Sequence, residues 1–192
     1  RVAPGEVLTL MGPSGCGKSS LLAALAGVLP PGGPIRLTGD ILLGAHRLTP
    51  LPPQERGVGI LFQDDLLFPH LSVGQNLAFA LPAALQGAAA RRARVEQTLR
   101  EIGLDGFHDR DPATLSGGQR ARVSLMRALL AEPCALLLDE PFSRLDAALR
   151  AQFRSFVFEQ IARQRIPTLL VTHDPDDVPP GGRVLDIHHW QA

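Results

Sequence analysis

Residues 12–19 read Gly12-Pro13-Ser14-Gly15-Cys16-Gly17-Lys18-Ser19, which matches the phosphate-loop pattern G-x-x-x-x-G-K-[ST]. A short apolar run, Val7–Met11, precedes this loop, and a helical pattern over Ser19–Ala26 follows it. Glycines let the backbone wrap closely around an anion, and the N–H groups of a helix N-terminus carry partial positive charge. The sequence therefore predicts a phosphate site between a buried strand and a helix.

The two last residues of the pattern carry separate roles. The Lys18 ammonium can reach the β- and γ-phosphates of a nucleotide, and the Ser19 hydroxyl can ligate Mg²⁺. The expected ligands are therefore ATP and Mg²⁺. The residues expected to contact the nucleotide here are Gly12, Pro13, Ser14, Gly15, Cys16, Gly17, Lys18, Ser19 and Ser20.

Further strands and helices alternate along the chain. Apolar runs at Val58–Phe62, Ala135–Leu138, Thr168–Thr172 and Val184–Ile187 predict strands, with one or two more joined through Gly39-Asp40 within 35–43. A helix is expected over Ala147–Gln164. Such alternation predicts an α/β fold with a mainly parallel sheet covered on both faces, as in P-loop NTPases with a RecA-like core.

Residues 64–131 have a different composition, rich in Ala, Leu and Arg. Apolar positions such as Val95, Leu99 and Ile102 recur at helical spacing. We expect a single domain over 1–192, in which a helical lobe at 64–131 is inserted into a core formed by 1–63 and 132–192.

Two acids end the apolar run Ala135–Leu138. Asp139 is expected to hold Mg²⁺ through water, and Glu140 to orient and polarise the attacking water. Many strands end in solvated acids, so this pair alone is a weak signal. The phosphate loop in the same chain favours the functional interpretation.

Composition limits the function classes. The 192 residues carry 19 basic and 19 acidic side chains, and this neutral balance argues against a nucleic-acid partner. No apolar run approaches the ~20 residues that span a bilayer, so a membrane part would come from another chain. Cys16 and Cys134 have no metal or disulfide spacing and are expected to be free thiols.

The stretch Leu115-Ser116-Gly117-Gly118-Gln119 narrows the class much further. Ser116 is a good N-cap, and the two glycines leave N–H groups bare at a helix N-terminus, which forms a second anion site. Here the sequence resembles the ATP-binding cassette family, whose signature is LSGGQ. The resemblance implies that residues 116–119 of one subunit cover the ATP held by its partner, so the nucleotide contacts include Ser116, Gly117, Gly118 and Gln119.

Other motifs of that family follow in order. Gln63 resembles the Q-loop glutamine, His173 the switch histidine, and Ser143-Arg144-Leu145-Asp146 the D-loop, in which Arg144 departs from the usual SALD. The resemblance implies a catalytic set of Glu140, His173 and Gln63. It implies a metal set of Ser19, Gln63 and Asp139.

Three longer stretches, 61–68, 72–77 and 111–115, are similar to the YnjD-type ATP-binding subunits of bacterial importers. The resemblance implies an ATPase that works as a dimer, with a second copy as the simplest partner. Permease subunits and a substrate-binding protein are its other expected partners, at the cytoplasmic face of the inner membrane. Phe68, Leu71 and Phe79 would contact a short helix of the permease or belong to the core of the lobe.

Two alternatives stay open at this point. The chain could be a soluble, non-transport cassette ATPase, although it shows neither tandem cassettes nor a heptad array. It could also be a binding module without hydrolysis, which the joint presence of Lys18, Asp139, Glu140 and His173 disfavours. Because Phe62 is the first aromatic residue, we expect that an N-terminal strand subdomain with the adenine-stacking residue is missing from this sequence.

Overall fold

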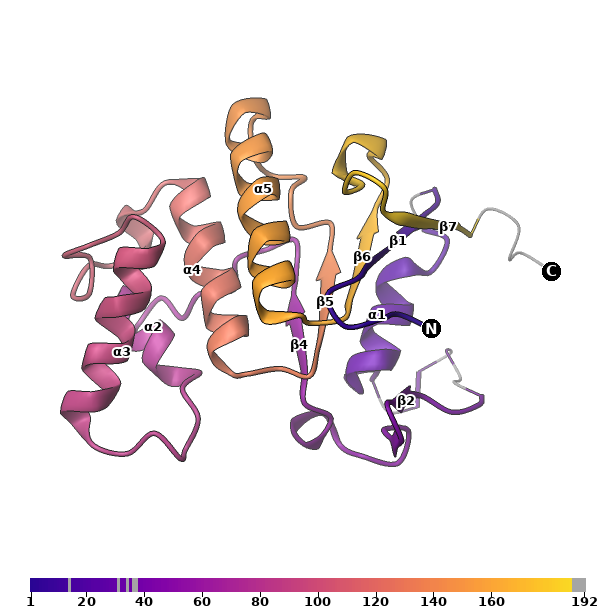
Figure 1. Cartoon of the computed structure of the whole chain (residues 1–192), viewed down its shortest axis with the longest axis horizontal. Helices are drawn as coiled ribbons and strands as arrows, with labels where there is room; N and C mark the ends of the chain where they lie inside the picture. The colour runs from indigo at the N-terminus through magenta and orange to yellow at the C-terminus, as the bar shows by residue number, and fades with distance from the viewer. Residues whose placement is uncertain (14, 31, 34, 36–37, 188–192) are drawn as a thin grey trace. The chain divides into compact units, whose positions relative to one another are not determined.

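Five strands form one sheet in the order β4-β5-β6-β1-β7 (Figure 1). Their bounds are β1 Val7–Met11, β4 Val58–Leu61, β5 Ala135–Asp139, β6 Thr168–Thr172 and β7 Arg183–Asp186. The strand β1 pairs in parallel with both β6 and β7, and β5 pairs in parallel with β6. The predicted α/β fold with a mainly parallel sheet is confirmed.

The computed structural model describes residues 1–13, 15–30, 32–33, 35 and 38–187. These residues group into two compact units. We call residues 1–60, 133–140 and 158–192 the core unit, and residues 61–132 and 141–157 the helical unit.

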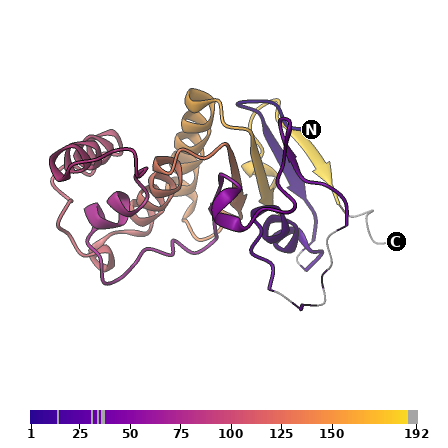
Figure 2. The same ribbon diagram turned by 90° about the horizontal axis from the view of Figure 1, so that it is seen from below.

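The helix α1, Lys18–Ala26, covers one face of the sheet in the core unit (Figure 2). Its Leu22 packs with Leu10 of β1, Leu137 of β5 and Val171 of β6 in a buried apolar cluster. Residues 136–138 of β5 are all at most 4% exposed, which explains why this strand is continuously apolar and does not alternate. The cluster holds α1 against the sheet, and the phosphate loop joins β1 to this helix.

The buried Arg56 caps the end of α1. Its Nη1 donates to the carbonyl oxygens of Ala24 and Leu25, both at 2.8 Å, and its Nε donates to Leu51 O at 2.9 Å. The last carbonyls of a helix have no partner within the helix and carry partial negative charge. A guanidinium from about thirty residues downstream supplies the missing donors and the opposite charge.

One strand prediction was placed incorrectly. Instead of strands joined through Gly39-Asp40, the short strands β2, Leu42–Leu43, and β3, His46–Arg47, pair in antiparallel fashion. Between them Gly44 has φ of 61°, the left-handed conformation that a two-residue hairpin loop requires. Positions 36 and 37 of the predicted stretch lie outside the described residues.

Helices dominate the helical unit. They are α2 Val73–Phe79, α3 Ala88–Glu101, α4 Gly117–Leu130 and the first part of α5 Ala147–Gln164. The predicted helical positions Val95, Leu99 and Ile102 are at most 2% exposed. Short 3₁₀ turns occur at Pro53–Glu55, Pro112–Thr114 and Pro175–Asp177. In the described part of the chain, no helix combines the length and apolar character needed to cross a bilayer.

Candidate active site

The phosphate loop requires glycine for two different reasons. A Cβ on buried Gly12 would lie 2.8 Å from Ile187 Cγ1 and 3.1 Å from Cys16 Sγ, so this position lacks space for a side chain. Gly17 has φ of 96° and precedes α1 as its N-cap, so there the backbone conformation favours glycine. Both glycines lie in the loop between β1 and α1, in the predicted order of strand, loop and helix. Ser14 lies outside the described residues.

Lys18 is folded into the loop that precedes it. The side chain is 5% exposed, and its Nζ donates to the carbonyl oxygens of Gly12 and Pro13, both at 2.8 Å. Cys16 Sγ lies 3.9 Å from the same nitrogen. The ammonium charge is therefore held within the glycine-rich turn, beside the exposed N-terminus of α1.

Ser19 and Asp139 meet although 120 residues separate them. The Ser19 hydroxyl donates to Asp139 Oδ1 at 3.0 Å. Burial raises the pKa of Asp139 above its usual 3.8, and the charge of Glu140 adds to this, while the Ser19 hydrogen bond and the Lys18 charge oppose it. A partly buried carboxylate beside a second acid is a site where a cation would be stabilised.

These two oxygens also have the right chemistry for Mg²⁺. Hydroxyl and carboxylate oxygens are its preferred ligands, and it is commonly held by one or two protein groups together with substrate phosphates. Within the described ranges, no three His, Cys, Asp or Glu side chains cluster as a complete protein-made metal cage. The residues present thus fit a metal shared with a phosphate ligand.

Glu140 and His173 form the other half of the site. His173 Nδ1 lies 3.2 Å from Glu140 Oε1. Glu140 has φ of 46°, and its backbone N–H donates to Val171 O at 2.9 Å, which ties it to β6 as the chain leaves β5. A non-glycine residue with positive φ is strained, and such strain is common at functional sites.

Thr172 and Asp177 hold the backbone on both sides of His173. The Thr172 hydroxyl donates to Asp177 Oδ2 at 2.7 Å and accepts from Asp174 N at 3.0 Å. Thr172 is 1% exposed and Asp177 is 3% exposed. The sequence analysis missed this anchor. A run of three acids within residues 174–177 was the visible signal, but nothing distinguished the buried acid from the other two.

The strand order explains how the site residues of the core unit come together. Because β6 lies between β5 and β1 and all three run in parallel, their carboxyl ends meet at one edge of the sheet. The phosphate loop follows β1, the two acids end β5, and His173 follows β6. Ligands in open α/β sheets bind at this edge.

The signature belongs to the helical unit, at the start of α4. Ser116 Oγ accepts from Gln119 N at 3.3 Å, and Gln119 Oε1 accepts from Ser116 N at 2.9 Å, which forms a capping box. A Cβ on Gly117 or Gly118 would meet no atom closer than 3.4 Å, so packing within the chain does not demand glycine there. Gly117 is partly exposed, whereas Gly118 is buried.

Gln63 also belongs to the helical unit and is exposed, two residues after the end of β4. Two acids follow it, Asp64 and Asp65, and each pairs with an arginine: Asp64 with Arg144 and Asp65 with Arg120. The sequence analysis noted Arg144 only as a departure from the D-loop pattern. The opposite charges were the signal that could have suggested the pairing.

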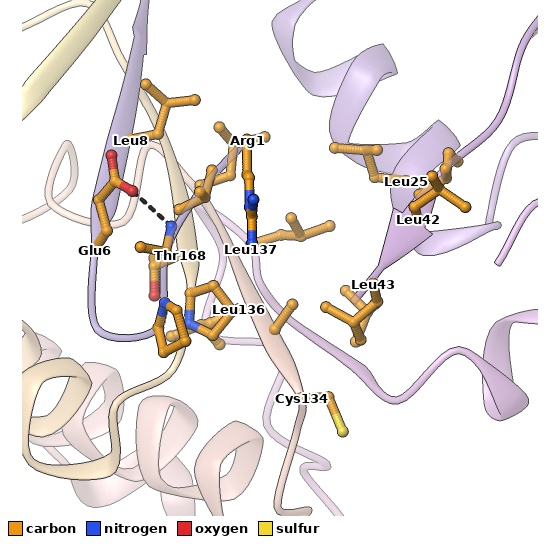
Figure 3. A pocket seen from close by; sticks show the side chains of 18 of the residues that line it. Arg1, Glu6, Leu8, Leu25, Leu42, Leu43, Cys134, Leu136, Leu137 and Thr168 are labelled. Carbon is orange, nitrogen blue, oxygen red and sulfur yellow. Dashed lines mark hydrogen bonds between the residues drawn. The ribbon is translucent and has the colours of Figure 1, made fainter. Parts of the chain in front are cut away.

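A groove of the core unit lies away from these residues. It has a volume of about 1430 Å³ and opens between α1, the β2–β3 hairpin and the sheet (Figure 3). Leu8, Leu136, Leu42 and Leu43 are among its mostly apolar lining residues. It reaches the beginning of β1, whereas the phosphate loop follows the other end of that strand. The polar residues of the candidate site, not this groove, therefore indicate where chemistry occurs.

Comparisons with known proteins agree with this geometry. The model of the ABC transporter family matches residues 1–143. The uncharacterized ABC transporter ATP-binding protein YnjD of Escherichia coli K12 is 55% identical over 98% of this chain and 86% of its own length. The thiamine import ATP-binding protein ThiQ of Cereibacter sphaeroides is 47% identical over 90% of this chain and 73% of its own length. The Fe(3+) ions import ATP-binding protein FbpC of Agrobacterium fabrum is 44% identical over 92% of this chain and 48% of its own length.

Proposed function

Because the chain belongs to the ABC transporter family and is an ATP-binding subunit with ATPase activity, we propose that it energises a bacterial importer as one half of an ATP-sandwich dimer. The observation that carries this proposal is the meeting of a phosphate loop, two acids and a histidine at one edge of the sheet. The import functions in the names of the thiamine and Fe(3+) relatives support the direction of transport.

The core unit supplies the binding half of the reaction. Lys18 and the N–H groups of the phosphate loop neutralise the phosphates of ATP. Ser19 and Asp139 would hold Mg²⁺, and we expect Gln63 to complete this set. The metal would neutralise charge that develops on the transferred phosphoryl group.

Glu140 and His173 supply the chemical half. Glu140 orients a water in line with the γ-phosphate and withdraws its proton, and His173 stabilises the developing charge by a hydrogen bond. The 3.2 Å contact between His173 Nδ1 and Glu140 Oε1 supports assigning both groups to one reaction. The hydrogen bond from Glu140 N to Val171 O holds this strained backbone at the carboxyl edge of the sheet.

The signature is proposed to act on the ATP of a partner copy. Ser116 and the N–H groups of Gly117 and Gly118 would cap the γ-phosphate bound to the partner's phosphate loop. Closure of the two copies would expel water and complete both sites. Hydrolysis would remove the link between the copies and open the dimer.

Permease subunits and a substrate-binding protein are the other proposed partners, and they would hold the chain at the cytoplasmic face of the inner membrane. Phe79 is 69% exposed and packs edge-on against Phe68, with ring centroids 4.9 Å apart. Leu66, which is 54% exposed, lies on the same loop as Phe68. Together with Leu71, these apolar side chains of the helical unit are the proposed contact for a short permease helix.

The substitution Glu140→Gln tests the hydrolytic assignment. The variant keeps its shape but lacks the base, so we expect ATP binding to persist and turnover to fall by about 10²- to 10⁴-fold. ATP should also convert it into a long-lived dimer that analytical ultracentrifugation detects. Glu159→Gln, which changes an exposed acid on α5, is the matched control and should behave as the parent protein does. A Glu140→Gln variant that hydrolyses ATP at the parental rate contradicts the assignment.

Co-purification separates transport from the soluble alternative. Under the proposal, the tagged chain brings down a polytopic membrane protein from detergent-solubilised cells. Recovery with ribosomes or DNA instead would support a non-transport cassette ATPase.

A further inference from the structure

We propose that the two acids after Gln63, Asp64 and Asp65, are positioning residues for ATP hydrolysis. Each forms an ion pair with an arginine of a different motif: Asp64 pairs with Arg144 of the D-loop, and Asp65 with Arg120 next to the signature. We call these two ion pairs the 64–65 clamp. The inference rests on the proposed function, because it assumes that Gln63 serves the metal and the attacking water.

The Asp65 arm of the clamp is the ion pair between Asp65 and Arg120. It joins the loop that carries Gln63 to the signature. Arg120 Nε donates to Asp65 Oδ2 at 2.9 Å, and Nη1 of the same guanidinium donates to Leu115 O at 2.6 Å. Leu115 directly precedes Ser116, the N-cap of α4. The Arg120 side chain therefore connects Asp65, two residues after Gln63, to Leu115, the first residue of the signature.

The backbone at Asp65 is also held by α4. Ser124 Oγ donates to Asp65 O at 2.7 Å, and Arg127 Nη2 lies 3.4 Å from the same oxygen. The next residue, Leu66, has φ of 47°, a conformation that is strained for leucine. Such strain persists only where neighbouring contacts hold the backbone, and here α4 supplies them.

The Asp64 arm joins the same loop to the D-loop. The family pattern has alanine where this chain has Arg144, and alanine could not pair with Asp64. Arg144 is 61% exposed and Asp64 is 53% exposed, so the pair adds little to folding stability and is screened by salt. Its removal can therefore test positioning without unfolding the protein.

Together the two arms restrain one loop from two sides. Because Asp64 and Asp65 directly follow Gln63, a large shift of Gln63 would strain their ion pairs with the D-loop and with Arg120 next to the signature. Small errors in the position of a catalytic group reduce turnover much more than they reduce substrate binding. Loss of the clamp should therefore lower kcat and leave the KM for ATP nearly unchanged.

The test compares Arg144→Ala and Asp65→Asn with a matched control in the full chain, assayed with Mg²⁺ and ATP. The control is Glu96→Gln on α3 of the same unit, which breaks a 2.9 Å ion pair with Arg92 that is about as exposed as the Asp64–Arg144 pair. We expect each clamp variant to lose about two- to fivefold in kcat, the effect of one exposed ion pair. The control should keep the parental kcat.

A charge exchange checks that the pairing itself is responsible. Asp64→Arg alone places two arginines together and should slow turnover, and adding Arg144→Asp should restore most of it. If the double variant is as slow as the single one, or if kcat of the clamp variants equals that of the control, the inference is overturned.

Hydrogen exchange provides a readout that does not depend on catalysis. Amides of residues 62–68 should exchange faster in Arg144→Ala than in Glu96→Gln, and equal exchange overturns the inference. If the parental chain shows no turnover at all, the proposed function fails. The exchange rates still decide whether the clamp restrains the loop.

Discussion

Removal of the Thr172 hydroxyl should slow hydrolysis, because this group anchors the loop that carries His173. Thr172→Val keeps the shape of the side chain and suits a strand. It deprives the buried Asp177 carboxylate of a donor at 2.7 Å and the Asp174 N–H of its acceptor at 3.0 Å. A hydrogen bond to a charged group contributes about 1.5–3 kcal/mol and a neutral one about 1 kcal/mol, so the free energy of unfolding should fall by roughly 2–4 kcal/mol.

The effect on turnover follows from geometry. His173 lies between the two anchored residues, and its Nδ1 is 3.2 Å from Glu140 Oε1. A shift of about 1 Å in a catalytic group can cost about 100-fold in rate, so we expect kcat to fall by about 10- to 100-fold. ATP binding, which depends on Lys18 and the phosphate loop, should change little. Denaturant titration measures the stability, and phosphate release measures the turnover.

Thr168→Val is the matched control on the same strand. Thr168 is also 1% exposed, but its hydroxyl donates to a neutral acceptor, Ile166 O, at 3.2 Å. This substitution should cost about 1 kcal/mol of stability and leave kcat unchanged. The reasoning is refuted if both variants lose the same stability and keep the same turnover.

Three further predictions concern the frame around the site. Gly12→Ala should cost about 1–3 kcal/mol of stability, measured by denaturant titration, because its Cβ would lie 2.8 Å from Ile187 Cγ1. Arg56→Met should lower Tm by roughly 6–12 °C, seen by calorimetry, because the last carbonyls of α1 lose a charged donor worth about 3 kcal/mol. Burial raises the pKa of Asp139, so ionisation of this carboxylate costs stability as the pH rises above its usual 3.8. Mg²⁺ binding would offset that cost, so the gain in Tm from adding Mg²⁺ to the ATP-bound chain should shrink as the pH falls towards 3.8 and be smaller in Asp139→Asn.

The sequence was sufficient to predict the elements that bring the site residues of the core unit together. The strands at Val7–Met11 and Thr168–Thr172 and the helix at Ala147–Gln164 have the predicted bounds. Apolar runs buried in a sheet and a glycine-rich turn are local signals, so no information about distant contacts was needed. The roles assigned to Gln63 and to residues 116–119 remain predictions.

Contacts between distant residues were not predictable in the same way. Charge alone does not identify which of 19 acids Arg56, Arg120 or Arg144 will approach, or whether a carbonyl will be the acceptor instead. The burial of Asp177 depends on how the turn after β6 folds back on Thr172. The hairpin β2–β3 was misplaced because Gly39 and Gly44 offered two equivalent turn signals, and only tertiary structure selects between them.

The position of β1 in the sheet has a consequence for biosynthesis. Both of its neighbours, β6 and β7, are translated about 160 residues or more after it. At about 5–20 residues per second, the ribosome needs roughly 10–30 s to deliver them. Throughout that interval the nascent polypeptide exposes the apolar segment Val7–Met11 without its neighbouring strands. A chaperone that binds exposed apolar segments would recognise it. The enzyme can acquire activity only after β6 and β7 have been translated.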